Sequence, residues 1–224
     1  MEVPHPDLFT LKHLFSREWV RSLCEAFLLL ILAFVAEHFA VLYAFEYIGR
    51  PTTTHVGDIL LDNLPIVNLN FIIIEIALFA IALGTVFVVC YRSRHLLFTL
   101  KSLALFITIR AFCMSLTHVG IYPGTILPGS GVLDVLYSYF NFQTGLFFSG
   151  HTGMPFLMAL IFWEKPFERS VFLLLSLTFA VAVLLAHVHY SIDVFAAPFM
   201  AYGIFKIAQY LFLRDYKLIE AGHV

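Results

Sequence analysis

Two short segments combine histidine with residues that could support proton transfer and nucleophilic attack. The first is 149–152, Ser-Gly-His-Thr, and the second is 189–193, His-Tyr-Ser-Ile-Asp. The four-residue spacing of the second segment would place the His189 imidazole and the Asp193 carboxylate on one helical face. Such a carboxylate fixes the tautomer of the ring and leaves its other nitrogen basic and nucleophilic. We therefore predict that Asp193 orients His189 as a nucleophile.

The first segment predicts an acid/base group beside an anion-binding turn. His151 follows a glycine at the expected start of a helix, where free backbone N–H groups can bind an anion. Gly150 permits close approach of the backbone, and Ser149 suits a helix N-cap. Either segment alone would fit a helix end with no further role. Together they predict phosphoryl transfer by His151, His189 and Asp193.

The composition indicates that lipid surrounds most of the chain. Of the 224 residues, 61% are hydrophobic and 12% are charged, and the mean hydropathy is +0.90. Soluble domains carry roughly 25% charged residues. The net charge of -2 and the absence of a basic stripe exclude a nucleic-acid partner. No spacing typical of a zinc or magnesium site occurs, so we predict neither a metal nor another cofactor.

Apolar runs predict an all-α, polytopic membrane protein built as a six-helix bundle. One membrane domain is expected over 1–224, with a cytoplasmic or interfacial segment at 1–19, a catalytic core at 20–213 and a cytoplasmic tail at 214–224. The six spans are expected at 20–45, 66–91, 96–118, 147–163, 168–187 and 189–213.

Basic residues predict the orientation of this bundle, because cytoplasmic loops are enriched in lysine and arginine. They lie before or at the start of the first span and occupy alternate connections and the tail: Lys12, Arg17, Arg21, Arg92, Arg94, Lys165, Arg169, Arg214 and Lys217. Both termini are then cytoplasmic. With that topology, both histidine segments begin spans on the extracytoplasmic side, where they can meet.

The two histidine segments resemble the C-terminal half of the sphingomyelin synthase family, a branch of the type 2 phosphatidic acid phosphatase superfamily. The second is part of a longer string, Ala-His-Val-His-Tyr-Ser-Ile-Asp-Val at 186–194. The acidic loop Gly-Asp-Ile-Leu-Leu-Asp-Asn-Leu-Pro at 57–65, with Glu75 after it, is similar to that branch as well. So is Arg110, with Thr117 and the Pro-Gly pair at 123–124 after it. The resemblance runs from about Pro51 to Ala208.

Departures from the wider superfamily favour the synthase branch. Classical phosphatases have an arginine six residues before the second histidine, where this chain has Val183. They also have proline after the arginine of the Lys-x6-Arg-Pro motif, whereas Ala111 follows Arg110 here. Animal synthases show an acidic residue shortly before Ser-Gly-His-Thr, where this chain has Gly-Leu-Phe-Phe at 145–148. The head group and the acceptor therefore stay open.

The resemblance implies a metal-independent phosphotransferase that moves a head group from a phospholipid donor to ceramide or a diacylglycerol-type lipid through a phosphohistidine. In this scheme His189 attacks phosphorus and His151 serves as acid and then as base. Residues expected to bind substrate are Arg110, Ser149, Gly150, Thr152, Tyr190 and Glu75. The site is expected on the periplasmic, lumenal or extracellular face of a multi-pass protein, with a bacterial inner membrane favoured. A homo-oligomer is left open.

Other interpretations remain at this stage. A lipid phosphate phosphatase or phospholipase C-type hydrolase would use the same histidines with water as acceptor, and a non-enzymatic lipid-binding protein would use neither. Arg110 could contact substrate or pair with Glu37 or Glu75, since charges inside a membrane are functional or paired. Four further polar residues have no assigned role: His38, Asp58, Asp62 and His187. The two aspartates could orient a head group or belong to a solvated loop.

Overall fold

The computed structural model describes residues 16–48, 50, 53–116, 118–126 and 147–220. These residues form helices joined by short segments, and the described part of the chain contains no strand, which confirms the all-α prediction. The elements are α2 (Arg17–Ile48), η1 (Phe71–Ile76), α3 (Ala77–Tyr91), α4 (Ser93–Leu116), α6 (Gly150–Ile161), α7 (Pro166–Leu185), α8 (Ser191–Leu211) and α9 (Leu213–Glu220). Element η1 is a π-helical turn that continues directly into α3.

Within the described ranges, five helical stretches are long and apolar enough to cross a membrane: Arg17–Tyr47, Phe71–Tyr91, Ser93–Leu116, Pro166–Leu185 and Ser191–Leu211. They correspond to five of the six predicted spans. The remaining prediction, 147–163, contains α6, which has only 12 residues. At 1.5 Å per residue it is about 18 Å long, against about 30 Å of bilayer hydrocarbon. The six-span count is therefore not confirmed.

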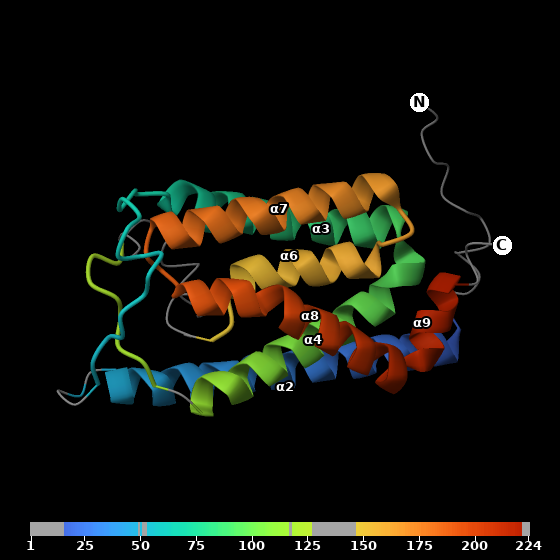
Figure 1. Ribbon diagram of the computed structural model, residues 1–224. Helices are drawn as coiled ribbons and strands as arrows, with labels where there is room; N and C mark the ends of the chain where they lie inside the picture. Colours follow the sequence, from blue (N-terminus) through green and yellow to red (C-terminus); the bar gives the residue numbers. More distant parts are fainter. Residues whose placement is uncertain (1–15, 49, 51–52, 117, 127–146, 221–224) are drawn as a thin grey trace.

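Helix α6 lies in the middle of the bundle, between α7 on one side and α8 on the other, while α2 runs along α4 (Figure 1). Small residues allow this close packing. Ala197 and Ala201 of α8 are fully buried, and a Cβ on Gly153 of α6 would lie only 2.8 Å from Phe106 Cζ. Phe106 of α4 packs edge-on against Phe148, which is completely buried just before α6. The start of α6 is thus fixed against two neighbouring helices.

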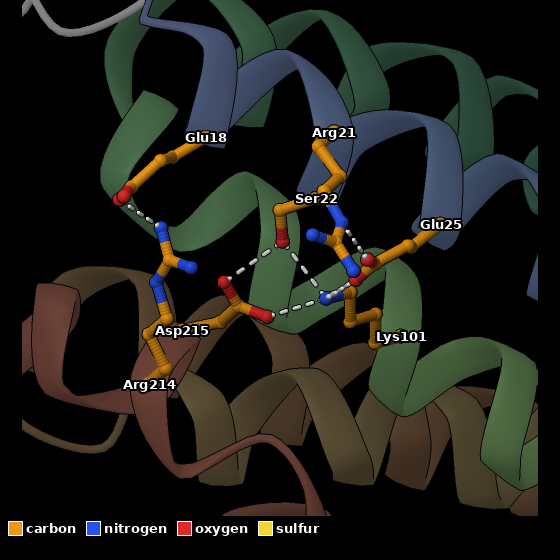
Figure 2. A network of polar contacts seen from close by, with 7 residues as sticks. All are labelled: Glu18, Arg21, Ser22, Glu25, Lys101, Arg214 and Asp215. Atoms are coloured by element: carbon orange, nitrogen blue, oxygen red, sulfur yellow. Dashed lines mark hydrogen bonds and ion pairs between the residues drawn. The ribbon is translucent and has the colours of Figure 1, made fainter.

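A buried polar network ties α9 to α2 and α4 (Figure 2). Lys101 Nζ lies 2.7 Å from Asp215 Oδ2 and 2.8 Å from Ser22 Oγ, and Ser22 donates to Asp215 Oδ1 at 3.0 Å. Arg214 pairs with Glu18 at 2.7 Å on the exposed side of the same network. The start of α2 and helix α9 therefore lie at the same end of the molecule, as the predicted topology requires of them.

Removal of the Asp215 charge is expected to destabilise the protein. In Asp215→Leu, Lys101 would remain buried with its main counter-charge missing, which typically costs about 3–5 kcal/mol. The measurement is the thermal unfolding midpoint in detergent. Glu18→Gln is the matched control, because its pair with Arg214 is exposed and such pairs contribute about 0–1 kcal/mol. Equal midpoint shifts for the two variants would contradict a buried structural pair.

Candidate active site

The segment Ser-Gly-His-Thr forms the predicted helix start. Ser149 is the N-cap of α6 in an extended conformation, and its hydroxyl oxygen accepts a hydrogen bond from the Thr152 N–H at 3.4 Å. Gly150 is the first helical residue and His151 the second, and both are buried. The His151 ring interacts with the backbone of Ile73 in η1. This geometry confirms the predicted cap and places the first backbone N–H groups of α6 beside the His151 side chain.

His189 and Asp193 are in contact, but not on one helical face. Helix α8 begins at Ser191 with Tyr190 as its N-cap, so His189 precedes the helix. Asp193 Oδ2 lies 3.3 Å from His189 Nδ1 and also accepts the Tyr190 N–H at 3.2 Å. Because Asp193 captures that N–H, the chain turns at Tyr190 and the ring folds back over the first turn. The predicted contact is confirmed, and its predicted helical geometry is wrong.

The two histidine segments are joined directly. The Ser149 N–H donates to the Asp193 carbonyl at 3.0 Å, so the starts of α6 and α8 share a backbone hydrogen bond. The ring centroids of His151 and His189 lie 6.3 Å apart. His189 Nε2 is buried and has no hydrogen-bond partner in the described part of the chain. With Nδ1–H held by Asp193, Nε2 carries a lone pair on a ring that is fixed in place.

Arg110 lies against the α6 turn and is paired. Its Nη1 forms an ion pair with Glu37 Oε1 of α2, and its Nε donates to the Phe148 carbonyl at 3.2 Å. Both charged side chains are buried. A Cβ on Gly150 would stand 3.5 Å from Arg110 Nε, which shows how closely the guanidinium approaches the turn. The ion-pair alternative with Glu37 is thereby confirmed.

The second acidic candidate lies apart from this pair. Glu75 is part of η1, and its Oε2 is buried with no hydrogen-bond partner among the residues described. A buried carboxylate oxygen without a partner is costly unless another group satisfies it. The predicted substrate contact of Glu75 stays a prediction.

Tyr190 is held by the loops that cover the site. Its hydroxyl donates to the Gly120 carbonyl at 2.8 Å and accepts the Val56 N–H at 3.3 Å, and the side chain is buried. Burial is the main cause that raises the pKa of Tyr190, opposed by the hydrogen bond from Val56. The hydroxyl therefore uses both its donor and its acceptor function to bind backbone groups of these loops. Sequence reasoning missed Val56 and Gly120, which act through backbone groups and carry no side-chain signal.

Two residues without an assigned role contact Tyr122, whose ring centroid lies 5.8 Å from that of Tyr190. His187 is buried, has a positive φ of 55° and packs against the edge of Tyr122. Asp62 is exposed and accepts a hydrogen bond from the Tyr122 hydroxyl, which raises the pKa of Tyr122 to about 12. His38 lies on α2 next to Glu37, with its ring edge against Phe39.

An apolar cavity of about 270 Å³ adjoins His151. Gly150 and His151 line one part of it, and Leu30 of α2, Gly84 of α3 and Leu103 of α4 line other parts. Almost every group on its wall is hydrocarbon. Within the described ranges, no cluster of three or more His, Cys, Asp or Glu side chains is arranged to hold a metal ion. A buried polar pair beside an apolar cavity is typical of a site for an amphipathic ligand.

These features fit a multi-pass membrane protein with two neighbouring histidines, one in the first turn of α6 and one just before α8. Residues 144–210, which contain both histidine segments, match the family described as PAP2 superfamily C-terminal. The match supports the PAP2 superfamily and fits an enzyme of phosphoryl-transfer or hydrolase type that acts on lipids. No curated protein matches this sequence.

Proposed function

We propose that this protein is a phospholipid head-group transferase resembling sphingomyelin synthase, with ceramide or a related lipid alcohol as acceptor. The observation that carries the proposal is the Asp193-held His189: its Nε2 has no hydrogen-bond partner among the described residues, and its ring centroid lies 6.3 Å from that of His151, which lines an apolar cavity. The Ser-Gly-His-Thr segment and the match to the PAP2 superfamily support the same chemistry.

In the first half-reaction, His189 Nε2 attacks the phosphorus of the donor lipid and a P–N bond forms. The P–O bond to diacylglycerol breaks, and His151 gives its proton to the departing oxygen. Asp193 stabilises the positive charge that develops on the imidazole. Acid catalysis of this kind contributes typically 10²–10⁴-fold. The products are diacylglycerol and a phosphohistidine that carries the head group.

In the second half-reaction, neutral His151 removes the proton from the acceptor hydroxyl. The acceptor oxygen attacks phosphorus, the P–N bond breaks, and both histidines return to their starting states. The first backbone N–H groups of α6 and the nearby Arg110 guanidinium stabilise the negative charge on the phosphoryl oxygens. The fixed helix start thus serves both steps without rearrangement.

The cavity favours a lipid as acceptor over water. Its hydrocarbon wall reaches His151, so an acyl or sphingoid chain can fill it while the reacting oxygen lies at the histidines. Exclusion of water from such a site limits hydrolysis of a reactive intermediate. The hydrolase alternative uses the same two histidines and differs only in the group that attacks the phosphohistidine.

The remaining parts of the proposal concern the membrane. The basic residues that flank the spans favour cytoplasmic termini, which places the histidine end on the extracytoplasmic face.

The test is lipid analysis after incubation with phosphatidylcholine or phosphatidylethanolamine, with and without ceramide. A ceramide-linked head group together with diacylglycerol, absent in His189→Ala, is the expected result. Release of water-soluble head-group phosphate irrespective of ceramide would instead identify a hydrolase. Absence of turnover with every donor would contradict the enzyme proposal.

Filling the cavity is expected to weaken use of long-chain lipids. Gly84 lines the cavity with open space around its Cα, so Gly84→Leu would project into it. Displacement of about two buried methylene groups, at about 0.8 kcal/mol each, raises KM roughly tenfold. The KM for short-chain analogues should be unchanged. Gly203→Leu is the matched control, because that glycine also has open space but does not line the cavity. Equal effects of the two variants on long-chain lipids would contradict a chain-binding role.

A further inference from the structure

We propose that Asp58 is a positioning residue that holds His189 in its reactive place through the first turn of α8. This inference rests on the proposed function, in which His189 is the nucleophile. Asp58 lies 131 positions before His189 in the sequence, in the loop formed by residues 53–64, which includes most of the acidic segment 57–65. Loop 53–64 covers the site end of the bundle (Figure 1).

Asp58 is first fixed within its own loop. Its Oδ1 accepts the N–H groups of Leu60 at 3.0 Å and Leu61 at 3.2 Å, while its carbonyl accepts the Asp62 N–H at 2.8 Å. Leu61 is buried and anchors the turn from the apolar side. The carboxylate is therefore held from a rigid turn, as is typical of aspartate in turns.

The second oxygen of Asp58 reaches α8. Asp58 Oδ2 accepts the Ser191 N–H at 2.6 Å. Ser191 is the first residue of α8, so its N–H has no partner within the helix and a carboxylate there is favourable. Burial disfavours ionisation of Asp58, but the hydrogen bonds from Ser191, Leu61 and Leu60 outweigh it and lower its pKa. The group is thus an anion at neutral pH.

A parallel connection holds the neighbouring residue. The Tyr190 hydroxyl joins Val56 of loop 53–64 to Gly120 of the segment 118–126. Those two segments also bond directly, since the Gly120 N–H donates to the Thr54 carbonyl at 3.2 Å. A Cβ on Gly120 would stand 2.8 Å from the Thr54 carbonyl carbon, so the two backbones are in close contact.

Three consecutive residues are consequently fixed, each by different partners. His189 is held by Asp193, Tyr190 by Gly120 and Val56, and Ser191 by Asp58. His189 lies outside the helix, so the hydrogen bonds of α8 do not fix its backbone. Loss of the Ser191 contact would let this turn shift, and misplacement by about 1 Å can cost about 10²-fold in rate.

The kinetic test compares Asp58→Asn and Asp58→Ala with Asn63→Ala. Asn63 lies in the same loop, and among the described residues its side chain donates to the Ile59 carbonyl and has no hydrogen bond to α8, so Asn63→Ala loosens the loop without changing α8. We expect kcat for diacylglycerol release to fall about tenfold in Asp58→Asn and about 10²-fold in Asp58→Ala. KM should change less than about twofold, because substrate binding is not altered. Asn63→Ala should retain the wild-type kcat.

A structural readout keeps the test independent of turnover. In protein labelled with ¹⁵N-histidine, the His189 ring signals are identified by their loss in His189→Gln. The wild type is expected to show a single Nδ1–H tautomer, and Asp58→Ala a mixture. An unchanged His189 spectrum, with kcat in Asp58→Ala no lower than in Asn63→Ala, would overturn the proposal. If the wild type turns over no phospholipid, the proposed function fails, while the spectra still decide whether Asp58 positions His189.

Discussion

His189→Ala is expected to lose turnover by at least about 10³-fold, because in the proposed mechanism the His189 ring forms the covalent intermediate. The structure supports this expectation through the ring itself: Nδ1 is held by Asp193, and Nε2 is buried without a partner in the described residues. The measurement is release of diacylglycerol from a labelled phospholipid in detergent micelles. His118→Phe is the control, since His118 lies at the same end and stacks on Tyr47 away from the pair.

The comparison with His151→Ala separates the two histidine roles. In the proposed mechanism His151 acts by proton transfer, so its loss should cost about 10²–10⁴-fold with a natural lipid. A donor with p-nitrophenol as leaving group needs no proton at the departing oxygen. With that donor, His151→Ala should still incorporate the labelled phosphoryl group into protein, whereas His189→Ala should not. Incorporation of label into His189→Ala would show that the nucleophile lies elsewhere.

The start of α6 could be predicted from the sequence because its signals are local. Ser149 followed by glycine is a cap pattern, and the cap hydrogen bond to Thr152 spans three residues. The contact of His189 with Asp193 could likewise be predicted from their four-residue spacing. The residue at which α8 begins could not be predicted, because it depends on which N–H the Asp193 carboxylate accepts. His189 and Asp193 come into contact whether both lie within the helix or Asp193 caps its start, so their spacing does not distinguish the two geometries.

Other features depend on packing between distant segments. The sequence allowed Arg110 to pair with Glu37 or Glu75, and the pairing of α2 with α4 selects Glu37. The length of α6 was overestimated because the apolar residues beyond Ile161 form a turn into α7 rather than more helix. Asp58 caps Ser191 across 133 positions, and no local pattern reports such a contact.

The Arg110–Glu37 pair allows the structural and chemical roles of one arginine to be separated. Arg110→Leu and Glu37→Leu each leave one buried charge without its partner, which should cost about 3–5 kcal/mol of unfolding free energy. The double variant Glu37→Leu/Arg110→Leu removes both charges and should recover most of that loss, because an apolar pair of similar volume is often as stable. Thermal unfolding in detergent measures all three.

Activity in the double variant then decides what Arg110 does. Its Nε holds the Phe148 carbonyl just before the α6 turn, and its charge lies beside Gly150. If that charge stabilises the phosphoryl oxygens, the double variant should be folded yet slower by about 10²–10³-fold, the usual cost of removing one such donor. Arg110→Lys should be impaired as well, because one ammonium group cannot reproduce the two-sided contact of a guanidinium. Wild-type turnover in a stable double variant would show that the pair serves only the fold, and the N–H groups of α6 would then carry the phosphoryl charge without it.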